Sequence, residues 1–430
     1  MPKESKGKEM RNVVGAQFEF METMLSLDQM LRAGSHHGVK SHDIERRANI
    51  IFEALGRATG KEVIETWKEE WLKDADEARK IVDPVERKEA IEKNDLKRAD
   101  DLSRLIDSIP NGGRGSLQMA LHQISSRPRP EELIYRAILV TSVSAFEGLV
   151  TACYRAILES KPDGVISGNK EFSLADLVSF NSIEDAVADS IERRVDAALR
   201  GSIEDWATTF QKFDVQFQNL GLDWPNIVEV FMRRNAYIHT QGKVNSTYVS
   251  KVKGSPAKGA LLMLDEAYLK EALSSVMALG MLISARTFIH LNPKHEVAAA
   301  GMSFLYINEL MDLGYWRCVK EVCANLKAMN SRLDMKFDLR FSYWLACKRL
   351  SGLESIRKEV ESLDVSALKT EYSFMKAVLL EDEKTAKVEL EVGLARSESW
   401  VNSSEIDSFL KHQEGAQWAF AERSRILGNN

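Results

Sequence analysis

The chain has 430 residues, more than one hydrophobic core usually supports, so we expect two or three domains. Its formal net charge is −6, with acidic and basic residues interleaved throughout, which argues against a protein that coats long nucleic acid. Only 9 prolines occur, and no segment alternates strictly between apolar and polar residues. The composition therefore predicts an all-α fold.

The cysteines and the apolar segments indicate a reducing, aqueous compartment. None of the four cysteines belongs to a C-x-x-C pair: Cys153, Cys318, Cys323 and Cys347. We expect them to be reduced residues of the core or of helix surfaces, as in cytosolic proteins. The first residues lead into no apolar segment, and the apolar runs 138–150 and 272–289 contain polar residues. We therefore expect no signal peptide, no membrane span and a cytoplasmic location.

Residues 1–125 are predicted to form an N-terminal helical region. After a polar tail, an amphipathic helix is expected from Phe18, and a charged helical stretch from Asp43 to Ile109. Four side chains in and beside the loop 34–43 could contact a metal: His36, His37, His42 and Asp43. They lack regular ligand spacing, so we expect no metal site. A sensor, a neutralising brace and a dimerisation arm all remain open roles for this region.

A second domain, residues 130–292, is expected after the sequence Arg-Pro-Arg-Pro at 127–130. Within it a helix is predicted from Asp223, which can cap an N-terminus, through Pro225 in the first turn. Gly242 can end this helix soon after His239. Three apolar residues at helical spacing define its expected buried face: Ile227, Phe231 and Ile238.

Arg234 completes that apolar row, where an aliphatic residue is expected. An unpaired buried charge costs several kcal/mol, so Arg234 needs a carboxylate, a phosphate or an opening to water. Arg233 lies on another row, and we expect it to form an exposed ion pair with Glu229, four residues earlier. Arg234 is therefore the candidate functional residue, and Arg233 a surface residue.

Asn235 and His239 share one face of the same helix, because they are four residues apart. The five-residue step from Arg234 to His239 turns the side chain by about 140°. Within one chain these two side chains are thus not expected to point to one place. They can converge if the helix distorts, or if two copies meet about a two-fold axis. A histidine titrates near neutral pH and suits proton transfer.

The segment Arg234 to His239, with the sequence Arg-Asn-Ala-Tyr-Ile-His, resembles the R-x4-6-H motif of the HEPN superfamily of helical ribonucleases. In that motif a polar residue follows the arginine. Residues 136–160, 172–213 and 267–289 resemble the other helices of the domain, so the likeness spans about 130–292. It implies a HEPN-like helical bundle, flanked by the N-terminal helical region and by a C-terminal array of helical hairpins.

The resemblance also implies an activity: RNA cleavage without a metal or cofactor, in which the ribose 2′-OH attacks the adjacent phosphodiester. The products carry 2′,3′-cyclic phosphate and 5′-OH ends. Arg234 would hold the phosphate, His239 would act as general base or acid, and Asn235 would orient His239 or the RNA. Glu147 is the candidate for a supporting polar residue on the first helix. The family suggests a homodimer and a regulated toxin or anti-phage effector, acting on an RNA such as tRNA.

Residues 296–430 are predicted to form helical hairpins. Turns are expected at Gly314, at Ser351-Gly352 and at Glu381-Asp382. Their uneven spacing resembles a degenerate tetratricopeptide-like array, a fold that offers a concave surface to peptides and proteins. We therefore expect this domain to bind a protein partner or an activating trigger.

Alternative interpretations remain open. In a non-catalytic HEPN scaffold, Arg234 would close a structural ion pair with Glu147, and His239 would satisfy carbonyls at the helix end. In a partner-binding or nucleotide-binding module, Arg234 would hold a phosphate without cleaving anything. Tyr237 and Trp206 likewise either stack on bases or fill helix interfaces.

Overall fold

The computed structural model describes residues 2–34, 130–161, 180–327, 333–366, 368–413 and 417–428, with Met329 and scattered positions between 50 and 122. Over these residues the chain is all-α, and its only β-type pairing is an isolated bridge between Lys243 and Leu261. Contacts divide the chain into two compact units. One comprises Met1–Gln29 and Arg136–Asn430, and the other Met30–Tyr135. The candidate site lies in the first unit.

The α-helices occur in this order along the chain: α1 (Pro2–Gly34), α6 (Pro130–Ser160), α9 (Ile183–Leu199), α10 (Ile203–Gln211), α11 (Trp224–His239), α12 (Ser246–Lys251), α13 (Glu266–Leu291), α14 (Glu296–Phe304), α15 (Ile307–Asp312), α16 (Trp316–Leu326), α17 (Leu333–Ser351), α18 (Arg357–Glu361), α19 (Thr370–Leu379), α20 (Glu383–Ala395), α21 (Ser404–Lys411) and α22 (Gln417–Gly428). Within the described residues, four short 3-10 helices join these elements: η1 (Gln218–Leu220), η2 (Pro293–His295), η3 (Leu353–Ser355) and η4 (Ser399–Asn402).

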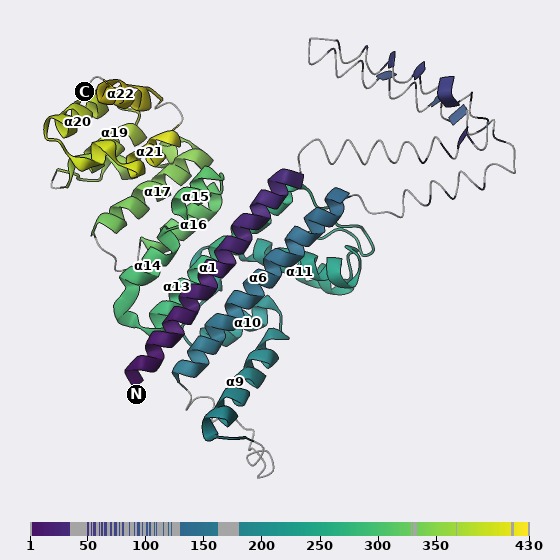
Figure 1. Cartoon of the computed structure of the whole chain (residues 1–430), viewed down its shortest axis with the longest axis horizontal. Coiled ribbons are helices and arrows are strands. Elements are labelled where there is room, and N and C mark those ends of the chain that lie inside the picture. The colour runs from purple at the N-terminus through teal and green to yellow at the C-terminus, as the bar shows by residue number, and fades with distance from the viewer. Residues whose placement is uncertain are drawn as a thin grey trace. The chain divides into compact units, whose positions relative to one another are not determined.

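Helix α1 begins at Pro2, so the expectation that this helix starts only at Phe18 is wrong. The physical reason is tertiary packing, because Val13 and Gln17 in this segment are buried. The amide of Gln17 accepts a hydrogen bond from the Ser284 hydroxyl of α13 at 2.6 Å. A Cβ atom at Gly280 would collide with the ring of Phe20, so the glycine permits the close approach of α1 and α13. Figure 1 shows α1 and α6 running side by side.

Helices α6 and α13 are both long and apolar enough to cross a membrane. The most apolar window of α13 is 89% buried within the fold, and that of α6 is 44% buried. The buried residues of α13 lie on every side of the helix, which explains an apolar sequence without a polar face. Helix α6 begins at Pro130, the last residue of the predicted boundary segment.

All four cysteines are buried and form no disulfide. Three of them are 0% exposed: Cys153, Cys318 and Cys323. Burial raises the pKa of the Cys153 thiol to about 12, so it stays protonated near neutral pH. The prediction that the cysteines pack into the protein is confirmed.

The three turns predicted in the C-terminal region are confirmed. Gly314, Gly352 and Glu381 all have positive φ angles, of 78°, 80° and 61°. Each lies between two helical segments: α15 and α16, α17 and η3, and α19 and α20. The second element of the middle pair is short, because η3 and the five-residue α18 replace one continuous helix. Of the tryptophans in this region, Trp344 and Trp400 are buried, and Trp316 and Trp418 are partly exposed.

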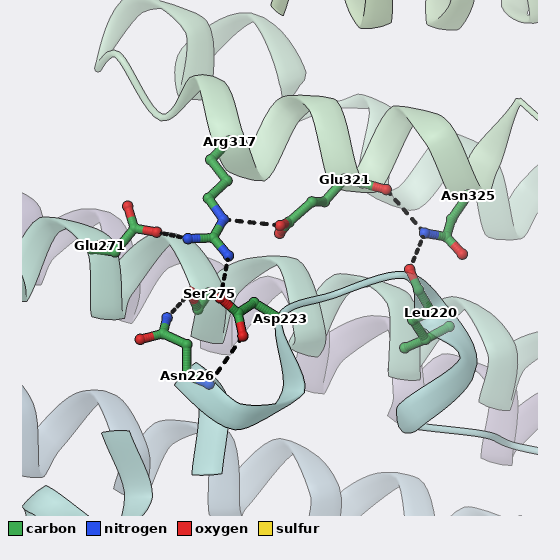
Figure 2. A network of polar contacts seen from close by, with 8 residues as sticks. All are labelled: Leu220, Asp223, Asn226, Glu271, Ser275, Arg317, Glu321 and Asn325. Carbon is green, nitrogen blue, oxygen red and sulfur yellow. Dashed lines mark hydrogen bonds and ion pairs between the residues drawn. The ribbon is translucent and has the colours of Figure 1, made fainter. Parts of the chain in front are cut away.

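Arg317 links α16 to α13 and to the start of α11 (Figure 2). Its Nε atom donates to Glu321 Oε1 at 3.0 Å, and its Nη2 atom to Asp223 Oδ2 at 3.2 Å. A third ion pair joins it to Glu271. These side chains are mostly partly exposed, and each pair contributes at most about 1 kcal/mol. One of these pairs places Arg317 against Asp223, the residue that precedes α11.

Asp223 also caps α11, since its Oδ1 atom accepts the Asn226 N–H at 3.2 Å. The Asn226 amide in turn donates to the Ser275 hydroxyl of α13 at 3.1 Å. Asn325 of α16 donates to the Leu220 carbonyl of η1 at 2.8 Å, just before the cap (Figure 2). The first turn of α11 is thus held from two sides, by α13 and by α16.

Candidate functional site

Helix α11 forms as the sequence predicts. It spans Trp224–His239, with Asp223 as N-cap and Pro225 in the first turn. Proline costs nothing there, because the first turn of a helix needs no N–H donors. After the helix, Gly242 adopts a φ of 78°, and its N–H bonds to the Ala236 carbonyl at 3.0 Å. A side chain at Gly242 would also collide with Tyr237, with a Cβ–Cε1 distance of 2.9 Å.

The predicted apolar row of α11 is only partly buried. Ile227 and Phe231 lie in the core, but Ile238 is 43% exposed, so the expectation that it packs inside is wrong. In the same turn Ala236 is 1% exposed, so only one side of the last turn faces away from the core. Arg234 lies one turn before Ile238 and is partly buried. That position gives its side chain a buried stem and access to the surface.

The predicted ion pair between Arg233 and Glu229 is present, with Nε and Oε1 2.6 Å apart. The expectation that it is exposed is wrong, because the two side chains are only 17% and 14% exposed. Arg233 also donates to the Met263 carbonyl at 2.7 Å, and its guanidinium lies 3.9 Å from the centre of the Tyr268 ring. The pair is therefore covered by the loop that contains Met263 and by α13, which contains Tyr268.

Two phenols complete the hydrogen bonding of Glu229. Tyr248 of α12 donates to Oε1 at 2.5 Å, and Tyr268 of α13 donates to Oε2 at 2.8 Å. Burial raises the pKa of both tyrosines, and the nearby Glu229 carboxylate raises it further, so both remain donors at neutral pH. This network holds α11 against α12 and α13. Sequence reasoning missed it, because its members are brought together only by the fold.

Arg234 pairs with Glu147 of α6, the residue proposed from the sequence as its support. Its Nη1 atom also donates to Oδ1 of Asn235 at 3.0 Å. The Arg234 side chain is 13% exposed, and burial lowers its pKa. Its Nε atom is buried and has no acceptor among the described residues. Arg234 therefore retains one donor for which the described part of the chain offers no partner.

A cleft of about 240 Å³ separates α11 from the turn that joins α9 to α10. Buried apolar residues form its base: Ile203, Trp206, Val228 and Phe231. All four residues singled out from the sequence line it: Glu147, Arg234, Asn235 and His239. His239 is exposed at the end of α11. Arg234 and His239 thus border the same cleft within one chain, five residues apart on α11.

The two aromatic residues considered for base stacking have structural contacts. Trp206 is buried, and its indole N–H donates to the Ala198 carbonyl at 2.9 Å. Tyr237 is partly buried and donates its hydroxyl to the Leu262 carbonyl. Both therefore fill helix interfaces, as the structural interpretation expected.

No protein family, curated protein or solved structure matches this chain. Across the described residues, no three His, Cys, Asp or Glu side chains are grouped to hold a metal ion. The loop residues considered for metal binding lie outside the described residues: His36, His37, His42 and Asp43. The side chains that line the cleft are therefore the observations that bear on its chemistry.

Replacing Glu147 with alanine is expected to destabilise the protein, because it leaves the largely buried Arg234 guanidinium without its carboxylate. We expect a loss of about 1–3 kcal/mol in the free energy of unfolding, measured by urea denaturation. Glu192→Ala is the control, since Glu192 pairs with Arg155 on the surface and is 53% exposed. This control is expected to lose less than about 1 kcal/mol. Equal losses of unfolding free energy in the two variants would show that the ion pair of Glu147 with Arg234 stabilises the protein no more than a surface ion pair does.

Proposed function

We propose that the chain is a metal-independent endoribonuclease of the HEPN type, which leaves 2′,3′-cyclic phosphate and 5′-OH ends. The observation that carries this proposal is the shared cleft of Arg234, Asn235 and His239. An arginine fork, an amide and an exposed imidazole are the groups that this reaction needs. Their cleft lies within one chain and has a buried apolar base.

Arg234 would bind the scissile phosphate. Two of its nitrogens are engaged, by Glu147 and by Asn235, and Nε has no acceptor among the described residues. A phosphate that displaces Glu147 would receive the charge-assisted hydrogen bond of Nη2. The charge that develops on the phosphate oxygens in the transition state would strengthen this bond.

His239 would transfer the proton. In the reaction the ribose 2′-oxygen loses a proton and bonds to phosphorus, while the bond from phosphorus to the 5′-oxygen breaks. The departing 5′-oxygen gains a proton. An exposed imidazole at the cleft rim can take the first proton as a base or give the second as an acid. Asn235 accepts a hydrogen bond from the Arg234 guanidinium, and its amide would orient His239 or the RNA.

The biological role that we propose is a regulated toxin or anti-phage effector in the cytoplasm, acting on an RNA such as tRNA. The enzyme would act as a homodimer through the domain of residues 130–292. The C-terminal helices would bind a partner or trigger. Arg317 supports such regulation, because it joins α16 to the N-cap of α11, the helix that carries Arg234 and His239.

A second candidate is a non-catalytic scaffold, or a module that binds a partner or a nucleotide. The ion pair of Arg234 with Glu147 favours it, because a guanidinium satisfied within the protein has a structural role without any substrate. In that case Arg234 would stabilise the contact of α6 with α11. His239 would then be an exposed residue without chemistry.

The experiment that separates the two functions incubates the purified chain with total RNA in the presence of EDTA. We expect cleavage to continue, because none of the proposed steps uses a metal ion. The RNA fragments should carry 5′-OH ends. Such ends are detected because an adapter can be ligated to them only after they have been phosphorylated. A His239→Ala preparation, purified in parallel, controls for contaminating nucleases. Intact RNA, or cleavage that stops in EDTA, would contradict the proposed reaction.

A further inference from the structure

Arg200 is a second cation on the cleft, and sequence reasoning did not find it. It follows α9 in the turn that forms the wall facing α11. The side chain is exposed, and it has no ion pair or hydrogen bond among the described residues. The carboxylates of the cleft are already engaged, since Glu147 pairs with Arg234 and Glu204 with Lys251. Among the described residues that line the cleft, no carboxylate pairs with Arg200, so its guanidinium is available to bind a ligand.

Hydrogen bonds and close packing hold the turn that carries Arg200. Ser202 caps α10, and its hydroxyl and backbone N–H both bond to the Asp205 carboxylate, at 2.8 and 2.7 Å. A Cβ atom at Gly201 would lie 2.8 Å from Cβ of Asp205, so no larger residue fits there without a shift. The backbone of Arg200 is thus fixed at the rim, while its long side chain can reach into the cleft.

The dimensions of the cleft limit what can enter it. Its volume of about 240 Å³ falls below the roughly 300–1,000 Å³ of most small-molecule pockets. A base pair within a duplex cannot enter so small a space, whereas one unstacked nucleotide of a single strand can place its backbone there. With Arg234 on one wall and Arg200 on the other, such a strand meets two guanidinium groups in succession.

We propose that Arg200 binds the phosphate next to the one held by Arg234, so that the cleft grips two consecutive phosphates of an unpaired RNA strand. This inference rests on the proposed function for the identity of the phosphate at Arg234. It assigns the substrate class as single-stranded RNA, in a loop or at an end. Arg200 is a binding residue and takes no part in the proton transfers.

Binding of a fluorescently labelled single-stranded RNA to the His239→Ala protein tests this inference without cleavage. Adding Arg200→Ala should weaken binding about tenfold, the loss of one charge-assisted hydrogen bond. The slope of log affinity against log salt concentration should fall by about 0.7, the value for one phosphate contact to a single strand. Arg193→Ala is the matched control, because Arg193 is an exposed arginine of α9, the helix that Arg200 follows, and pairs with Asp189 outside the cleft.

The control should leave both affinity and salt slope nearly unchanged, and the same RNA in a duplex should bind weakly with no dependence on Arg200. Equal effects of Arg200→Ala and Arg193→Ala would overturn the inference. So would equal binding of the duplex, or no binding of either RNA. Single-strand binding that depends on Arg200, in a wild-type chain that leaves RNA uncut, would support the inference while refuting the proposed cleavage.

Discussion

Replacing either Arg234 or His239 with alanine is expected to lower the rate of RNA cleavage by about 100-fold to 10,000-fold. The first change removes the guanidinium that would stabilise charge on the phosphate oxygens. The second removes the group that would transfer a proton. Both groups would act chiefly in the transition state, so each loss should appear chiefly in kcat, measured at saturating RNA.

Matched controls test whether these losses belong to the cleft. Arg193→Ala and His295→Ala remove the same side-chain types from exposed positions outside it, and we expect both to keep the wild-type rate. Arg234→Lys keeps the charge but loses the planar fork, so it should recover only part of the activity. Full activity in either Arg234→Ala or His239→Ala would refute the nuclease assignment, whatever the controls show.

Replacing Phe146 with alanine should lower the free energy of unfolding by about 3–5 kcal/mol. The ring is completely buried on α6, directly before Glu147. Its centre lies 5.5 Å from that of Phe231, 6.3 Å from that of Phe20 and 6.4 Å from that of Trp206. The cluster thus joins α1, α6, α10 and α11, the last three of which border the cleft. Removing the ring should leave a cavity among these four helices.

Urea denaturation measures this loss, and Phe146→Leu gives a graded comparison. Leucine keeps part of the buried volume, so we expect a loss of less than about 1.5 kcal/mol. Phe18→Ala is the control. It removes the same type of ring from α1, but Phe18 is 39% exposed and therefore less buried than Phe146. A loss below about 1 kcal/mol for Phe146→Ala would mean that α6 and α11 are held together by other contacts.

Local signals in the sequence were sufficient for the helix that carries the candidate site. Asp223 caps α11, Pro225 lies in its first turn and Gly242 follows it with positive φ, all as predicted. The C-terminal turns at Gly314 and Gly352 were found in the same way. These features depend on residues close together in the chain, where the identity of one side chain decides the backbone conformation.

Burial was predicted less well, because it depends on residues far apart in the sequence. Arg233 is covered by Met263 and Tyr268, so its pair with Glu229 is not a surface pair. Ile238 follows the apolar period of α11 but extends beyond the core. Arg200 carries no motif of its own and enters the cleft only because the turn between α9 and α10 faces α11. Helical periodicity does not contain this information.

The most direct test of the nuclease proposal is to map RNA ends in cells that express the intact chain, with and without phage challenge. Cells that express His239→Ala at the same protein level are the comparison. We expect new 5′-OH and 2′,3′-cyclic phosphate ends with the wild-type chain and none with the variant. The same new ends in both strains, or no new ends in either, would contradict the assignment of Arg234 and His239 to an RNA-cleaving site.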